Sequence, residues 1–395
     1  MNHKIHLKSS QMWDSTFQLM SWWKTNEVGN ATVMVVGAGA LGNEVLKNLA
    51  LLGVGHIIIV DFDKVEYSNL NRSILFRKED SIQHAYKAHV VAQRIEEINP
   101  NIKVETIIGD ITIDVGLGVF RRVNVVIGCL DNRLARLYLN RLCYKVGTTW
   151  IDGAIENLAG ELTVYNPQKS CYECELSPKE WDNIRVKLGC PDIAKRNISY
   201  GRIPTTPISA SIIAAIQVQE ALKIIHGNEK QSIAGQKFYY EGMNMTVLQY
   251  PCDAPKEDCM SHFQYEDIIE ASALSTSTSI HEALRWLSKH FGEANPTIEL
   301  DHEFVLELTA EKSEEVFHIT KPKPHLSNEY LDSLAAQEET LFITKSVSYI
   351  DKTFPMSHLS LQEIGIPSLH IIQVNANEET YFVELTGDKA SMGFS

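Results

Sequence analysis

The sequence predicts an α/β protein built on a doubly wound, mostly parallel sheet and followed by a smaller α+β domain. Three observations support this. β-branched strands alternate with helices of apolar periodicity, a glycine turn joins the first strand to the first helix, and a polar turn cluster interrupts the pattern at about 251–262. A chain of 395 residues is also long enough for two domains.

The elements follow in an order that builds such a sheet. Residues 31–60 predict a strand, a glycine turn, a helix and a second strand. Later segments continue the alternation, with helices at 86–98, 133–146 and 209–227 and strands at 103–110, 123–131 and 149–155. Beyond them, one helix and four short strands predict the second domain, at 280–292, 297–308, 314–320, 369–376 and 380–385. We therefore expect domains over 1–260 and 263–395.

Bulk composition narrows the classes of function. A net charge of −14 disfavours nucleic-acid binding and suits a partner with a basic face. The first residues lack the pattern of a signal peptide, and no apolar run has the length of a membrane span. We expect a cytoplasmic protein with neither nucleic-acid nor membrane partners.

A glycine cluster predicts a nucleotide site. Gly37, Gly39 and Gly42 stand between a strand and a helix, where glycines let the backbone approach phosphates and the helix offers free N–H groups. This Rossmann-like pattern alone also fits a dehydrogenase. In that case Asp61 or Asp63, at the end of the second strand, would bind the ribose of NAD.

Charged side chains at later positions favour a triphosphate instead. Asn69 and Arg72 follow the second strand, Lys87 opens the next helix, and Asp131 lies at the carboxyl end of a later strand. Open α/β sheets bind ligands at that edge. Arginine and lysine neutralise phosphates, and a carboxylate there suits Mg²⁺, whereas hydride transfer needs no such set. We therefore expect ATP and Mg²⁺.

The ordered motifs "GAGALGNE", "VDFDKVEYSNLNR", "CLDN" and "PTTPISASIIAAIQVQEALK" resemble those of the E1-like superfamily over about residues 31–250. This superfamily contains ubiquitin-activating enzymes and bacterial relatives that activate sulfur carriers. The resemblance implies adenylation of a small protein's C-terminal carboxylate. It also implies that Asp61 binds ribose, that Asn69, Arg72 and Lys87 contact phosphates, and that Asp131 holds Mg²⁺.

One departure from the family concerns the N-terminus. Family members usually present an arginine there that reaches the nucleotide of a second subunit, whereas this chain has no arginine before Arg72. Lys24 could substitute, or another chain could supply the charge. We expect a homodimer or an E1-like partner chain.

Four cysteines predict a structural zinc site. Cys171 and Cys174 have the usual two-residue spacing, and Cys252 and Cys259 would complete a tetrahedral set. Six residues separate the second pair, so His262 could replace one ligand. The remaining cysteines of the predicted sheet and helices are expected to be small buried hydrophobes: Cys129 and Cys143.

Cys190 lies in a polar and basic stretch within a loop at about 175–206. Nearby cations favour a thiolate there, although a structural thiol is the alternative. In E1 enzymes the catalytic cysteine precedes a matching "TTP" stretch. The resemblance therefore implies that Cys190 takes the small protein as a thioester.

The end of the chain, residues 358–388, resembles the C-terminal ubiquitin-fold domain of E1 enzymes, a β-grasp module that recruits an E2 conjugating enzyme. The whole layout resembles compact bacterial E1-like enzymes whose operons also encode ubiquitin-like and E2-like proteins and are linked to phage defence. A stabilising appendage is the alternative for this tail.

Three functions stay open. The first is an E1-like enzyme that adenylates a ubiquitin-like protein, forms a thioester and passes it to an E2-like protein. The second is an adenylyltransferase for a sulfur-carrier protein, although no cysteine follows Cys259 to serve in a sulfur-relay tail. The third is a catalytically idle partner of a second E1 chain.

Overall fold

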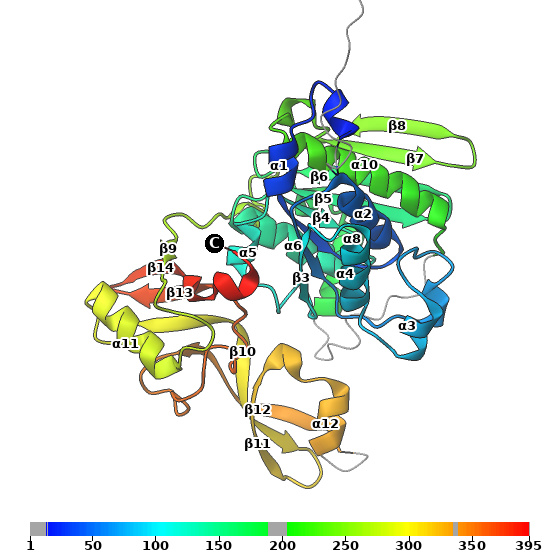
Figure 1. The fold of residues 1–395 in the computed structure, drawn as a ribbon. Helices are drawn as coiled ribbons and strands as arrows, with labels where there is room; N and C mark the ends of the chain where they lie inside the picture. Colours follow the sequence, from blue (N-terminus) through cyan, green and yellow to red (C-terminus); the bar gives the residue numbers. More distant parts are fainter. Residues whose placement is uncertain (1–12, 14, 189–203, 335–338, 395) are drawn as a thin grey trace, which may run out of the picture. The chain divides into compact units, whose positions relative to one another are not determined.

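The computed structural model describes residue 13 and residues 15–188, 204–334 and 339–394 (Figure 1). Internal contacts divide the chain into two compact units. The first unit contains residues 1–111, 122–175 and 201–262, and the second contains residues 112–121, 176–200 and 263–395. Each is described by itself.

The first unit is built on an eight-stranded sheet in the order β3-β2-β1-β4-β5-β6-β7-β8. The first five strands in this order pair in parallel, and the last three are added antiparallel. The predicted α/β class with a mostly parallel sheet is confirmed. The strands are β1 (Thr32–Val36), β2 (His56–Val60), β3 (Lys103–Ile107), β4 (Val125–Gly128), β5 (Trp150–Glu156), β6 (Ala159–Tyr165), β7 (Gln236–Glu241) and β8 (Thr246–Pro251).

Sequence signals explain where the helices of this unit begin and end. Gly53 ends α2 with a left-handed backbone, φ +77°. Asn132 begins α6 by accepting a hydrogen bond from the Ala135 amide, and Thr206 begins α10 in the same way. The helices are α1 (Thr25–Asn30), α2 (Ala40–Leu52), α3 (Lys78–Ile82), α4 (Lys87–Ile98), α6 (Arg133–Lys145), α7 (Tyr172–Glu175) and α10 (Pro207–Ile225).

Helix α10 is long and apolar enough to cross a membrane by composition alone, and half of it is buried inside the structure. It packs against α2, β5 and β6. Ile213, Ala214 and Val218 belong to the same buried cluster as the central strands. These contacts are those of a core helix, as the sequence predicts.

The second unit is α+β. Its sheet has the order β11-β10-β13-β14-β9, with β12 also paired to β10. All pairs are antiparallel except β9 with β14. Its elements are α5 (Leu117–Phe120), α8 (Pro178–Leu188), β9 (Ile269–Glu270), α11 (Ile280–Phe291), β10 (Thr297–Ala310), β11 (Val316–Pro322), α12 (Asn328–Leu334), β12 (Leu341–Ile350), β13 (Ile371–Ala376) and β14 (Glu379–Glu384).

Helix α11 covers the core of this unit. Ser279 and Glu282 form a capping box at its start, and Gly292 ends it with φ +67°. Leu284 and Leu287 point into a buried cluster with residues of β10, β13 and β14. The predicted helix at 280–292 is therefore confirmed.

A short piece of chain between β3 and β4 is part of the second unit. The Gly118 amide donates to the Leu369 carbonyl at 2.8 Å. A Cβ atom on Gly116 would lie 2.1 Å from the Ser368 carbonyl oxygen, so only glycine fits there. Arg121 forms an ion pair with the fully buried Glu384. Segment 112–121 thus packs as a component of the C-terminal domain.

Candidate functional site

The glycine turn after β1 is closed by direct backbone contacts. Gly37 has φ +96°, and its amide donates to the Val60 carbonyl at 2.8 Å. A Cβ on Gly42 would lie 1.9 Å from the Gly37 carbonyl oxygen. Gly39 differs, because nothing lies within 4 Å of the position its Cβ would take. The turn therefore presents open backbone at Gly39, directly before helix α2, where a phosphate can approach.

Asn43 of α2 is bonded to this turn, a role that the sequence pattern does not predict. Its fully buried amide donates to the carbonyls of Ala38 at 2.7 Å and Gly39 at 3.0 Å. Its oxygen accepts from the Leu75 amide at 2.8 Å. One side chain therefore joins the glycine turn to the loop that follows β2. A polar residue in an otherwise apolar helix face was the available signal.

Asp61 lies between the end of β2 and the glycine turn. Its two carboxylate oxygens accept from the amides of Ala38 and Asp63, both at 2.7 Å. Burial raises the pKa of Asp61, and the positive charge of Lys87 opposes this rise. The carboxylate is therefore fixed at the strand end, where the resemblance places a ribose ligand.

Lys87 and Asp63 form the charged pair of the site. The Lys87 ammonium lies 2.6 Å from an Asp63 oxygen, and the Lys87 amide donates to the Asp63 carbonyl at 2.9 Å. The lysine side chain is only 12% exposed, whereas Asp63 is 53% exposed. The cation is therefore held at the edge of the sheet by the chain that leaves β2.

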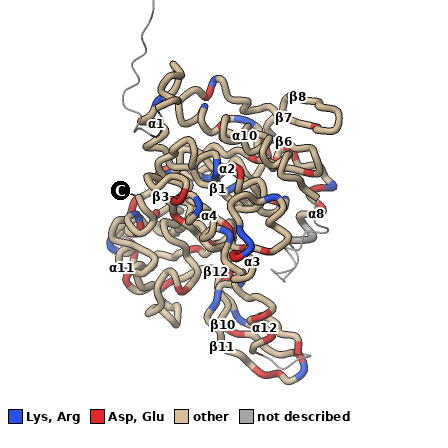
Figure 2. The backbone as a smooth tube through the Cα atoms, turned by 45° about the vertical axis from the view of Figure 1, so that its right-hand side comes forward, with Lys and Arg blue, Asp and Glu red and all other residues tan. Residues whose placement is uncertain are grey.

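Asn69 and Arg72 are engaged locally. The Asn69 oxygen accepts from the Glu66 amide at 2.9 Å in the single turn Tyr67–Asn69. The Arg72 guanidinium donates to the Ser68 carbonyl at 2.7 Å. Basic and acidic residues both lie at the start of α3, the next helix along the chain (Figure 2).

Asp131 is exposed and lies three residues beyond the end of β4. Strands β2, β1 and β4 are neighbours in the sheet, so Asp61, Gly37 and Asp131 follow the carboxyl ends of three adjacent parallel strands. These three residues therefore lie along the same edge of the sheet. This arrangement can receive a nucleotide at the glycine turn and a cation at Asp131.

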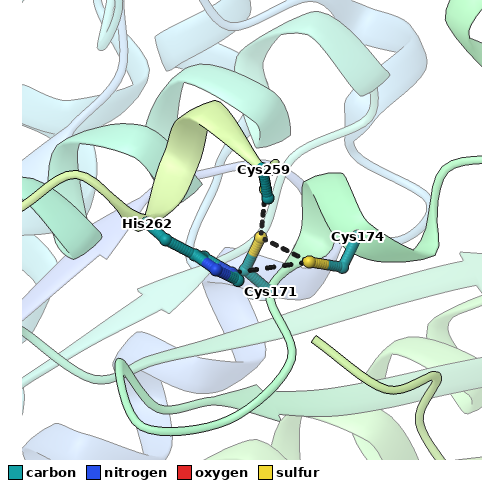
Figure 3. Close-up of side chains that lie close together, drawn as sticks. All are labelled: Cys171, Cys174, Cys259 and His262. Carbon is teal, nitrogen blue, oxygen red and sulfur yellow. Dashed lines mark hydrogen bonds between the residues drawn. The ribbon is translucent and has the colours of Figure 1, made fainter. Parts of the chain in front are cut away.

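A second cluster has the ligands of a metal site. The ligand atoms of Cys171, Cys174, Cys259 and His262 all lie within 4.8 Å of one another (Figure 3). The Cys171 sulfur is 3.6 Å from Cys174 and 3.5 Å from Cys259, and His262 Nε2 is 3.4 Å from the Cys174 sulfur. Three thiols and one imidazole fit tetrahedral zinc.

The predicted set of four cysteines is corrected at one position. Cys252 directly follows strand β8, where its amide donates to the Gly235 carbonyl at 3.0 Å. Burial, together with a hydrogen bond to Glu175, raises the pKa of its thiol to about 12. His262 takes its place in the cluster because a single turn, Met260–His262, brings the imidazole back to Cys174.

Polar contacts around the cluster join its two halves. Arg141 donates to both oxygens of Glu173 at 2.9 Å, and Ser261 also donates to Glu173. The ring of Tyr144 stacks on His262 with centroids 5.4 Å apart. Such contacts orient ligands around a bound metal.

Four further predicted positions differ in where they lie. The Lys24 ammonium donates to the His226 carbonyl at 3.0 Å, at the end of α10. Cys143 is fully buried, and burial raises the pKa of the half-buried Cys129 thiol. Cys190 lies outside the described residues, as does the rest of 189–203.

A family model described as "ThiF family" matches residues 15–261. The chain belongs to the ThiF family. Among its relatives, the SAMP-activating enzyme E1 of Haloferax volcanii is 30% identical over 252 residues, which are 62% of this chain and 88% of that enzyme. The sulfur carrier protein adenylyltransferase of Thermus thermophilus is 31% identical over 232 residues, 56% of this chain and 80% of the relative.

Other ThiF-family relatives are longer. The adenylyltransferase and sulfurtransferase MOCS3 of Culex quinquefasciatus is 32% identical over 232 residues, which are 58% of this chain and 50% of that protein. This chain therefore spans only half of that relative. A crystal structure of E. coli MccB has 20% identity and a TM-score of 0.52, covering 65% of this chain and 74% of that chain. That likeness supports the E1-like fold alone.

Proposed function

We propose that this ThiF-family protein uses ATP and Mg²⁺ to adenylate the C-terminal carboxylate of a ubiquitin-like protein. The observation that carries the proposal is the shared strand edge. There the open Gly39 backbone and the Asp131 carboxylate follow neighbouring parallel strands, and the Lys87 ammonium at the start of α4 pairs with Asp63 just beyond β2.

The chemistry assigns a task to each of these groups. The carboxylate oxygen of the small protein attacks the α-phosphorus of ATP, and the bond from that phosphorus to the bridging oxygen breaks, releasing pyrophosphate. Lys87 and Arg72 stabilise negative charge on the phosphates, and Asp61 positions the ribose. Asp131 would hold Mg²⁺, which neutralises phosphate charge. The acyl-adenylate keeps the carboxyl group activated.

The second step is a proposal about Cys190. Its thiol loses a proton, the sulfur attacks the acyl carbon, and AMP leaves, so that a thioester forms. We propose that the C-terminal domain then recruits an E2-like protein that receives the cargo. This domain lies beyond the part matched by the family model, which ends at residue 261. We propose that the protein acts in a conjugation system linked to phage defence, like the compact bacterial E1-like enzymes that its layout resembles.

Zinc and a second subunit complete the proposal. Cys171, Cys174, Cys259 and His262 would hold structural zinc, because their donor set and spacing suit it. Lys24 is bonded to the end of α10 of its own chain, which favours a cation from elsewhere for the nucleotide. We therefore propose a homodimer or an E1-like partner chain.

The alternative is activation of a sulfur carrier without a thioester. The name of the Thermus relative supports it, because that protein is called a sulfur carrier protein adenylyltransferase. Under this alternative, Cys190 has no role in transfer. The absence of cysteine after Cys259 argues only against a sulfur relay in the tail.

Intact-protein mass spectrometry distinguishes thioester transfer through Cys190 from sulfur-carrier activation without a thioester. The enzyme is incubated with ATP, Mg²⁺ and ubiquitin-like proteins from the same genome, and wild type is compared with Cys190→Ala. A thiol-labile adduct that is lost in Cys190→Ala supports thioester transfer, and Cys252→Ala is the matched control. Adenylate without an adduct supports the sulfur-carrier function. If the purified chain does not catalyse ATP–pyrophosphate exchange, the result favours the third function, a catalytically idle partner of a second E1 chain.

A further inference from the structure

The ladder between β4 and β5 ends at Gly128 and Asp152, three residues before Asp131. At this end of the ladder, side chains donate to backbone oxygens. Gln217 of α10 donates to the Gly128 carbonyl at 2.9 Å and to the Ile151 carbonyl at 3.3 Å. Gln217 thus bonds both strands at the end of their ladder.

Arg136 of α6 makes the outermost of these contacts. One terminal nitrogen donates to the Leu130 carbonyl at 2.7 Å and to the Gly153 carbonyl at 3.2 Å. Its Nε donates to Asp152 at 3.0 Å, and the side chain is 13% exposed. The planar guanidinium therefore contacts both strand ends at once in a fixed fork, a geometry that the flexible ammonium of a lysine does not provide.

The Leu130 contact bears directly on Asp131. The Leu130 carbonyl belongs to the peptide that joins these two residues, so its orientation sets the direction in which the Asp131 side chain leaves the backbone. On the other side, the Asn132 side chain accepts from the Ala135 amide at 2.8 Å. Asp131 is therefore held between two anchored residues although its own side chain is exposed.

The ion pair of Arg136 with Asp152 is a weak source of stability by itself. Removing two charges from water costs several kcal/mol, and apolar residues of similar size are often as stabilising. A purely structural role therefore does not require a guanidinium at this position. The guanidinium fork also bonds the Leu130 and Gly153 carbonyls, which this ion pair does not explain.

We propose that Arg136 is a positioning residue for the magnesium ligand Asp131. The inference rests on the proposed function, in which Asp131 binds Mg²⁺ together with the phosphates of ATP. Removing the guanidinium would release the 130–131 peptide and weaken cation binding while leaving ATP contacts at the glycine turn in place.

The test is a magnesium titration of ATP binding, measured by calorimetry on the full chain with ATP and MgCl₂ as the probes. Arg136→Lys should raise the Mg²⁺ concentration for half-maximal binding by about 10-fold to 100-fold, the range seen when outer contacts of metal ligands are lost. In an Asp131→Asn background, adding Arg136→Lys should raise the Mg²⁺ midpoint little further, because both changes act on the same ligand. Asp152→Asn, which frees Nε, should cause a smaller rise.

Arg94→Lys is the matched control. Arg94 of α4 is also a little-exposed arginine, 15% exposed, and it pairs with Asp80 of α3 and Glu97 of its own helix. If Arg136→Lys lowers the melting temperature as Arg94→Lys does but leaves the magnesium midpoint unchanged, Arg136 is only structural and the inference is wrong. If wild type binds no ATP at any Mg²⁺ concentration, the proposed function itself fails.

Discussion

The Lys87 ammonium lies 2.6 Å from the Asp63 carboxylate. This pair joins the first residue of α4 to the chain that leaves β2. The Asp63 carboxylate is therefore the partner of the Lys87 ammonium in this structure. A phosphate bound by Lys87 would have to displace Asp63 from the ammonium.

Lys87→Ala should therefore lower ATP–pyrophosphate exchange by about 100-fold or more, the loss typical of a donor that stabilises developing charge. The free energy of unfolding should change by less than about 1 kcal/mol, because Asp63 is exposed. Lys64→Ala, which removes a cation stacked on Tyr86, is the control and should keep its activity. Full exchange by Lys87→Ala would remove Lys87 from the catalytic set.

Gly37 and Gly39 of the turn should respond differently to alanine. Gly37→Ala should cost about 1–3 kcal/mol, because φ is +96° and the new Cβ would lie 2.5 Å from the Cys129 carbonyl oxygen. Gly39→Ala should leave the melting temperature nearly unchanged, because its φ is −72° and the space is open. Exchange should still fall at least about tenfold in Gly39→Ala, a loss of about 1.4 kcal/mol. A fully active Gly39→Ala would show that phosphate does not approach this position.

Metal content should separate His262 and Cys252. We expect about one zinc per chain by mass spectrometry of the purified protein, and expect Cys259→Ser and His262→Ala to lose it. Cys252→Ser should retain zinc, because its thiol lies outside the cluster. The opposite pattern, with zinc lost only in Cys252→Ser, would restore the four-cysteine prediction.

His56 should make the protein sensitive to acid. Burial, and secondly the charge of Lys103, lower its pKa from 6.5 to about 4. The unfolded chain therefore binds a proton more readily, so the stabilising contribution is present above pH 6.5 and is lost as the pH falls toward 4. The loss should reach at most about 3 kcal/mol by pH 4. Urea unfolding at pH 7 and pH 4 should show a smaller loss in His56→Gln, whereas the exposed His89→Gln should match wild type.

Arg121 should stabilise the C-terminal domain strongly. Its partner Glu384 is fully buried, and removing one member of such a pair leaves an uncompensated charge. Arg121→Ala should therefore cost about 3–5 kcal/mol, measured as a shift of the unfolding transition of this domain. Lys389→Ala, which removes an exposed ion pair with Glu270 of the same domain, provides the comparison, and equal losses in the two variants would contradict the assigned role of the pair.

Much of the strand edge could be predicted because local rules determine it. Gly37, Asp61 and Asp131 each follow a strand of clear β-branched pattern, and adjacent parallel strands bring such positions together. Arg136 and Asn43 could not be predicted in the same way. Both lie in helices of apolar periodicity, and a single sequence does not tell which distant backbone oxygens a buried polar group will reach.

The metal cluster shows a different limit. Spacing along the chain favoured Cys252, but distance in space depends on where the edge strand β8 ends. The Gly235 contact fixes Cys252 at that edge, and the turn at 260–262 carries His262 inward instead. Turn geometry of this kind is not encoded in ligand spacing.

Segment 112–121 also changes how this molecule can be divided by experiment or by evolution. A gene fragment beginning at residue 263 would encode a C-terminal domain without one of its own interior pieces, leaving the grooves around Leu369 and Glu384 unfilled. A shuffled or transplanted tail would need a matching loop between β3 and β4. Substitutions at Gly116 and Gly118 should therefore be inherited together with changes near residues 368–370, more than 240 positions away in the gene.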